Sequence, residues 1–156
     1  MKSSNVRRHL RNSERTGWRD KRISERHRLW GNDIYFTDVD FCGIEYYSRK
    51  GILLIDYKEW CKRDGLILQS PSHQSLSWLA DGRGIPAAVV LYNFDVRPRT
   101  FEVIPLNDSA RRYFGQRQIM TEEEWVSHQY HLRGLAQDDY FQYIINRLKN
   151  DTNTNT

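Results

Sequence analysis

The chain has 156 residues, with 38% hydrophobic and 13% aromatic residues and a formal net charge of +4. This length predicts one domain with an ordinary hydrophobic core. No apolar run approaches the roughly 18 residues of a membrane span, and the N-terminus lacks the apolar stretch of a secretory signal, so we expect a cytoplasmic protein without a membrane role. Cys42 and Cys61 lack metal-ligand spacing, so we expect them to be buried free thiols.

Positive charge is concentrated at the start of the chain. Residues 1–30 hold ten Lys and Arg against three Asp and Glu, a net charge of +7, whereas the rest holds 14 against 17. Such a block is typical of proteins that bind a phosphate backbone, and a basic tail without a partner is the alternative. The candidate nucleic-acid-binding residues are Arg7, Arg8, Arg11, Arg15, Arg19 and Arg22.

The first half of the chain predicts an arm, a helix and a β-meander. Residues 1–11 are too polar to pack and predict a flexible basic arm, after which a domain spans residues 12–150. A helix is expected from about Ser13 to Leu29. Strands are expected at 34–36, 39–47 and 52–57, because these stretches are rich in β-branched and aromatic residues. The loop at 48–51, with Gly51 available for positive φ, predicts an antiparallel hairpin.

The second half predicts a buried strand between helices. The stretch 60–68 has no clear period and stays unassigned. Ser70 and Pro71 begin a helix that Asp81 and Gly82 end. The remaining predicted elements are a strand buried on both faces at 85–92, an edge strand at 101–104, helices at 107–114, 121–133 and 138–149, and a disordered tail at 151–156. Together these elements predict an α/β fold with a mixed sheet and C-terminal helices.

Acidic side chains near the predicted hairpin suggest a metal site. Asp56 and Lys58 share one face of a strand because side chains alternate, and Asp38 and Asp40 share a face of the preceding strand. If Asp40 lies opposite Asp56, the two carboxylates need a cation between them. Hard oxygen ligands suit Mg²⁺ or Mn²⁺, and Lys58 can orient a water or offset negative charge. This set of residues predicts metal-assisted phosphodiester hydrolysis.

The arrangement resembles the PD-(D/E)xK nuclease superfamily over roughly residues 13–92. Asp40 corresponds to the first acid, and Asp56-Tyr57-Lys58 to the acid-x-lysine element. The chain is also similar to small phage and bacterial proteins with a D-x-D-F, E-Y and D/E-Y-K pattern. The resemblance implies a restriction-endonuclease-like core of helix, three-stranded meander, helix and strand, and a nuclease acting on DNA. It further implies a metal held by Asp40, Asp56 and the main-chain carbonyl of Tyr57, with Glu25 as an additional acid.

Several other residues are candidates for the site. Glu45 would reach it only if a bulge at Gly43 resets the strand register. His27 could position a water or contact a phosphate, or it could be a partly buried helix histidine. Gln74 or His73 could meet a phosphate at a helix N-terminus, although an ordinary solvated position is the alternative. His128 and His131 suggest a metal pair only weakly, because the sequence places no third ligand. Trp125, Tyr130, Tyr140 and Tyr143 are expected in the core rather than as platforms on which nucleic-acid bases stack.

Two interpretations of function stay open. Asp56 and Lys58 could form a catalytic pair, or a solvated ion pair of little consequence. Correspondingly, the protein is either a metal-dependent DNA nuclease or a non-catalytic nucleic-acid-binding or protein-inhibiting module with the same fold. Cutting both strands of a duplex would favour a homodimer.

Overall fold

The computed structural model describes residues 39, 41–45, 48–134 and 139–154, all within the compact unit Val39–Thr156. The predicted arm, first helix and first strand lie outside the described residues. So do the following candidate residues: Arg7, Arg8, Arg11, Arg15, Arg19, Arg22, Glu25, His27, Asp38 and Asp40.

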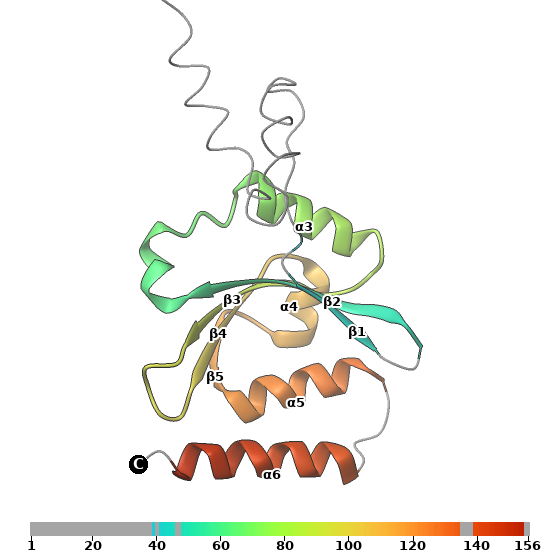
Figure 1. The fold of residues 1–156 in the computed structure, drawn as a ribbon. Coiled ribbons are helices and arrows are strands. Elements are labelled where there is room, and N and C mark those ends of the chain that lie inside the picture. Colours follow the sequence, from blue (N-terminus) through green and yellow to red (C-terminus); the bar gives the residue numbers. More distant parts are fainter. Residues whose placement is uncertain (1–38, 40, 46–47, 135–138, 155–156) are drawn as a thin grey trace, which may run out of the picture. The chain divides into compact units, whose positions relative to one another are not determined.

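A five-stranded mixed sheet forms the centre of this unit (Figure 1). Its strands, in spatial as well as sequence order, are β1 (Phe41–Glu45), β2 (Lys50–Glu59), β3 (Ala87–Asn93), β4 (Thr100–Pro105) and β5 (Gln118–Thr121). β2 and β3 are parallel, and the other neighbouring strands are antiparallel. The predicted α/β class and mixed sheet are confirmed. The predicted edge position of β4 is wrong, because β5 pairs with it on the outer side; β5 is too short to show an alternating pattern in the sequence.

The predicted hairpin joins β1 and β2. The left-handed residue of its turn is Arg49, with φ of 55°, rather than Gly51. The Arg49 N–H donates to the Glu45 carbonyl at 2.8 Å, and the Ser48 N–H donates to the Glu45 carboxylate at 2.6 Å. The register shifts by one residue between Gly43 and Ile44, so a bulge is present beside the predicted glycine.

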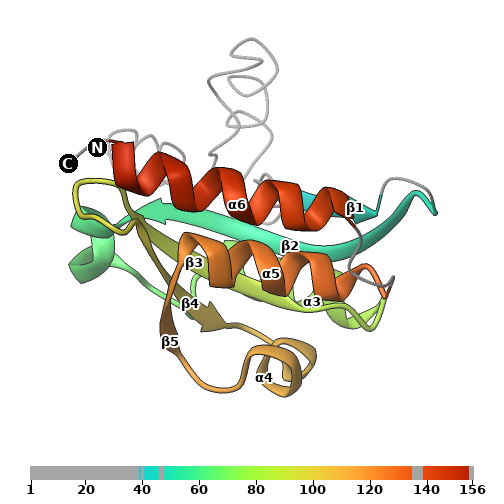
Figure 2. The ribbon, with the colours of Figure 1, turned by 90° about the horizontal axis from the view of Figure 1, so that it is seen from below.

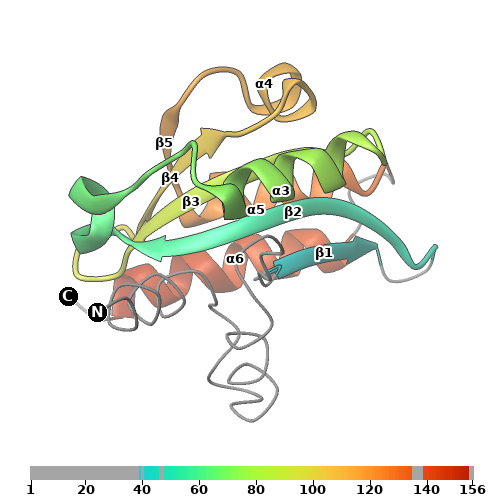
Figure 3. The same ribbon diagram turned by 90° about the horizontal axis from the view of Figure 1, so that it is seen from above.

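Helix α3 (Pro71–Asp81) connects the parallel strands β2 and β3 and covers one face of the sheet (Figure 3). As predicted, Ser70 caps it by accepting from the His73 N–H at 3.3 Å, with proline at the first helical position. Leu76 and Ala80 pack against Leu54 and Ala87. The unassigned stretch before it contains a 3₁₀ helix, η1 (Trp60–Gly65).

Helices α4 (Asp108–Phe114), α5 (Glu122–Leu132) and α6 (Asp139–Thr154) follow β4. Phe114 of α4 and Trp125 of α5 join the core on the face opposite α3, and α6 lies against α5 (Figure 2). The predicted caps of α4 and α5 are present, including the complete capping box at Thr121. Helix α6 continues through Thr154 where a polar tail was expected, and Asp151 in this extension pairs with Arg99 at 2.8 Å.

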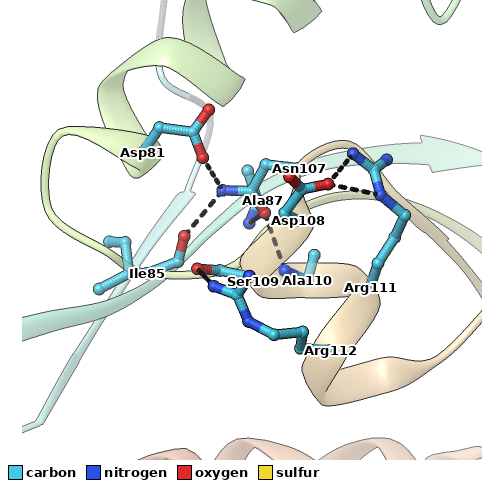
Figure 4. A network of polar contacts seen from close by, with 9 residues as sticks. All are labelled: Asp81, Ile85, Ala87, Asn107, Asp108, Ser109, Ala110, Arg111 and Arg112. Carbon is cyan, nitrogen blue, oxygen red and sulfur yellow. Dashed lines mark hydrogen bonds and ion pairs between the residues drawn. The ribbon is translucent and has the colours of Figure 1, made fainter.

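Asn107 joins three elements at the start of α4 (Figure 4). Its side-chain oxygen accepts from the N–H groups of Ala110 and Ala87 at 2.9 and 3.0 Å. Its amide nitrogen donates to the Asp81 carboxylate and the Ile85 carbonyl, each at 2.9 Å. The side chain is only 2% exposed, so all four of its hydrogen bonds are made inside the protein. Asn107 therefore fixes the end of α3, the start of β3 and the start of α4 together.

Some predictions of burial are wrong. Cys42 and Cys61 are exposed free thiols, because one lies on the terminal strand β1 and the other in η1. Tyr140 and Tyr143 are exposed, whereas Trp125 is buried as predicted. In the described ranges, no helix combines the length and apolar character that crossing a membrane requires.

Candidate functional site

The candidate site is centred on the carboxylate of Asp56. Asp56 follows the buried run Leu53–Ile55 on β2 and lies opposite Val89 of β3, in the interior of the sheet. Because side chains alternate, Leu54 and Asp56 point towards α3, whereas Ile55 joins the core on the other face. Asp56 is only 8% exposed. The sequence pattern of the strand thus places an acid where burial is costly unless a cation accompanies it.

Two nitrogen-bearing side chains contact the carboxylate. The Lys58 ammonium donates to Oδ1 of Asp56 from the same strand face. His73, in the first turn of α3, places Nε2 2.7 Å from Oδ2 of Asp56 and Nδ1 2.9 Å from the Ile67 carbonyl oxygen. His73 is 4% exposed. The alternative of a solvated Asp56–Lys58 pair does not agree with the burial of Asp56 or with its second partner, His73.

The contacts of His73 define how many protons His73 and Asp56 hold together. A carbonyl oxygen and an ionised carboxylate only accept hydrogen bonds, but a neutral imidazole has one N–H. Bonds at both ring nitrogens therefore need a second proton, either on the ring or on the Asp56 carboxyl. In both cases Asp56 and His73 together are neutral, and Lys58 adds one positive charge. The three side chains together therefore carry one net positive charge.

The role of His73 was missed by sequence reasoning, which gave it only a helix-terminus contact to phosphate. A signal was available, because His73, Leu76 and Ala80 share the buried face of α3 at helical spacing. A histidine on the buried face of a helix needs a polar partner on the element beneath it. The partner is Asp56, 17 positions earlier in the sequence.

A cleft of about 520 Å³ lies beside His73, between α3, the loop before it and the start of α4. Gln74 lines this cleft as an exposed side chain, as do Trp78 and Arg111. Trp78 is 74% exposed, which is unusual for so large an aromatic side chain. The structure thus brings the predicted Gln74 near His73, but not into the contacts of Asp56.

The other described candidates lie apart from Asp56. Glu45 lies at the hairpin turn, paired with Lys50, six residues along β2 from Asp56 and therefore roughly 20 Å away at 3.3 Å per residue. The bulge does not bring Glu45 to the site. The side chain of Tyr57 points to the opposite face, where its hydroxyl accepts from the Trp125 indole N–H at 3.0 Å. Burial raises the pKa of this hydroxyl, and the hydrogen bond from Trp125 offsets part of the effect.

The described residues alone do not complete a metal site. Among them, no group of three or more His, Cys, Asp or Glu side chains could hold a metal ion, and His128 and His131 therefore belong to no such group. Burial lowers the pKa of His128, with a smaller contribution from His131, and its ring packs against Tyr113 and Phe114. His128 therefore has a packing role. Asp56 supplies one carboxylate, and the second acid predicted from the sequence lies outside the described residues.

Comparisons of this chain with protein-family models, with curated proteins and with solved structures found no match.

Proposed function

We propose that the protein is a divalent-metal-dependent nuclease that hydrolyses phosphodiester bonds in DNA. The observation that carries the proposal is the buried Asp56 carboxylate, which shares a strand face with Lys58 and contacts its ammonium group. A buried charge network in a small domain is costly, and such networks occur disproportionately at functional sites. The element order supports a restriction-endonuclease-like core, because the hairpin β1–β2, helix α3 and parallel strand β3 match the last two meander strands, the helix and the final strand of that core.

The proposal also requires Asp40 to lie opposite Asp56. An antiparallel pairing of these two positions demands that Phe41 pair with Ile55, and this is the observed register of β1 and β2. The bulge lies further along the hairpin, beyond Gly43, so it does not alter this register. The described strands therefore support the predicted pairing of the two acids.

Asp40, Asp56 and the main-chain carbonyl of Tyr57 would hold the metal. Asp56 fits this role, because each carboxylate oxygen has two acceptor sites, so a carboxylate can bind a metal and accept hydrogen bonds such as those of Lys58 and His73 at the same time. Bound Mg²⁺ or Mn²⁺ would supply Lewis-acid stabilisation of a phosphodiester and a more acidic water. Lys58 would offset charge that develops on the phosphate, and His73 would fix the orientation of Asp56. The basic stretch 1–30 would add affinity for DNA.

A cleavage assay with matched lysine variants tests the proposal. Wild-type protein should cut DNA with Mg²⁺ or Mn²⁺ and not with EDTA. Lys58→Ala should remove most cleavage while DNA binding stays within a few-fold, since the ammonium acts chiefly in the transition state. Lys62→Ala is the control, because Lys62 is an exposed lysine of η1 paired with Glu59 at 3.5 Å. A Lys58→Ala variant that cleaves at the wild-type rate would refute the assigned role of Lys58.

A second candidate is a non-catalytic module that binds nucleic acid or inhibits another protein. The observation in its favour is that Asp56 is already paired with Lys58 and His73, an arrangement that is electrostatically complete without a metal. Wild-type protein that binds DNA but cuts no duplex, branched or single-stranded substrate with either metal would support this candidate and exclude the nuclease.

A further inference from the structure

A second charged cluster lies on the sheet away from Asp56 and is built on the carboxylate of Glu102. Glu102 of β4 is only 3% exposed. Arg117, just before β5, donates through Nε to Oε1 of Glu102, and Nε of Arg63 in η1 lies 3.9 Å from Oε2. The Arg63 guanidinium also lies over the Trp60 ring, 5.0 Å from its centroid. We call Glu102, Arg63, Arg117 and Trp60 the Glu102 cluster.

The Glu102 cluster shares a sheet face with the candidate site. Lys58 of β2 pairs with Leu91 of β3, and Leu91 pairs with Glu102 of β4. Side chains of directly paired residues point to the same side of a sheet, so Lys58 and Glu102 face the same way. They are two strands apart, which is roughly 10 Å between their backbone positions. Figure 3 shows this face, with α3 over β2 and β3 and with η1 at the end of β2.

Charge and geometry make the Glu102 cluster suited to an anion. One guanidinium neutralises the buried carboxylate, and the second leaves a net charge of +1. Both arginines approach Glu102 through Nε, and among the described residues their terminal Nη nitrogens make no hydrogen bond or ion pair. Both side chains are about half exposed. A planar guanidinium that contacts Glu102 through Nε keeps its Nη donors for another partner, and a guanidinium matches the bidentate geometry of phosphate.

We propose that Arg63 and Arg117 of the Glu102 cluster bind a backbone phosphate of the DNA substrate, a few nucleotides from the phosphate at Lys58. The identity of the ligand rests on the proposed function. Glu102 acts as a positioning residue: it holds Arg117 by a hydrogen bond and attracts Arg63 by its charge before DNA binds, which reduces the entropy lost on binding. Trp60 limits the motion of Arg63 by stacking.

Salt-dependent binding of fluorescein-labelled duplex DNA in EDTA tests the inference without requiring cleavage. Arg63→Ala and Arg117→Ala should each weaken binding and reduce the slope of log affinity against log salt by roughly 0.9, the value for one lost phosphate contact. Arg83→Ala is the matched control, because Arg83 is an exposed arginine in the turn before β3, at the opposite end of that strand from Leu91. It should leave the slope unchanged.

Arg63→Ala decides the test if Arg117→Ala fails to fold, since Arg63 is the looser partner of Glu102. Arg63→Lys should retain the wild-type slope. A slope for Arg63→Ala equal to that of wild type, or wild-type protein that does not bind the DNA, would overturn the inference. Slopes reduced as expected in a protein that cleaves nothing would support the phosphate site and exclude the nuclease. DNA cleavage by wild-type protein, with slopes for the arginine variants equal to the wild-type slope, would support the nuclease and overturn the phosphate site.

Discussion

Asp56 and Asn107 are side chains of almost the same shape, both buried and both hydrogen-bonded inside the protein, yet they are satisfied in different ways. Asn107 uses two donors and two acceptors with four separate groups at 2.9–3.0 Å. Asp56 accepts from Lys58, and its contact with His73 needs an additional proton on the imidazole or on the carboxyl. Asn107 is neutral, whereas Asp56 brings a charge that must be compensated.

The difference separates a structural junction from a candidate reactive site. A neutral amide can join three elements without any cost for burying charge, which suits a purely structural role. A buried ion pair is rarely more stabilising than a neutral replacement of similar shape. Retaining charge at Asp56 therefore favours a functional reason, and exchanging acid and amide at the two positions tests this directly.

Asn107→Asp should have the largest effect on the free energy of unfolding. The new carboxylate would keep the contacts to Ala87 and Ala110 but would lose both donors, and it would face the Asp81 carboxylate and the Ile85 carbonyl. We expect a loss on the order of 3 to 5 kcal/mol in urea denaturation. Asn93→Asp is the control, since the hydrogen bond that the Asn93 side chain makes with the described residues is the one it accepts from the exposed Asp95 N–H. Equal losses in both variants would contradict the junction role of Asn107.

His73→Ala should rank second. The substitution removes the partner of Asp56 Oδ2 and the bond to the Ile67 carbonyl, and it leaves a buried carboxylate with Lys58 as its described partner. A loss of about 1.5 to 3 kcal/mol is expected, the range for a hydrogen bond to a charged group. Gln74→Ala, a neighbouring exposed position of α3, should cost much less. Indistinguishable denaturation midpoints for the two variants would show that His73 does not stabilise the fold.

Asp56→Asn should change stability by only about 1 kcal/mol while removing metal-dependent cleavage. The new amide oxygen can accept from Lys58, and its NH₂ group can donate to Nε2 of a neutral His73 that keeps its bond to Ile67, so the network remains satisfied with one proton fewer. Denaturation and DNA cleavage should be measured on the same preparation. Retained cleavage would exclude Asp56 as a metal ligand, and a large loss of stability would make it a structural residue like Asn107.

Tyr57→Phe should have the smallest combined effect on stability and cleavage. We expect a loss of about 0.5 to 1.5 kcal/mol, because the substitution removes the acceptor of the Trp125 indole N–H. Tyr57 precedes Lys58, but its side chain points away from the candidate site, so cleavage should be unchanged. A fall in cleavage comparable to that of Lys58→Ala would mean that the two faces of β2 are not independent.

Local sequence determined much of the secondary structure. Ser70, Asn107 and Thr121 were predicted as helix caps, and each accepts from a backbone N–H three residues later. A cap depends on neighbours in the chain, so its signal lies within a few residues. The hairpin and the buried strand β3 were predictable for the same reason, from turn residues and an uninterrupted apolar run. The acid-x-lysine face of β2 followed from strand alternation alone.

Only the tertiary structure decided which polar groups meet. Asp56 and His73 come together because α3 packs its buried face on β2, and Glu102 meets Arg63 and Arg117 because η1 and the approach to β5 border the same sheet face. The short strand β5 likewise exists through its pairing with β4, without a sequence pattern of its own. These contacts depend on how the elements pack and not on local propensity, since no short-range periodicity records which side chain will lie across from another.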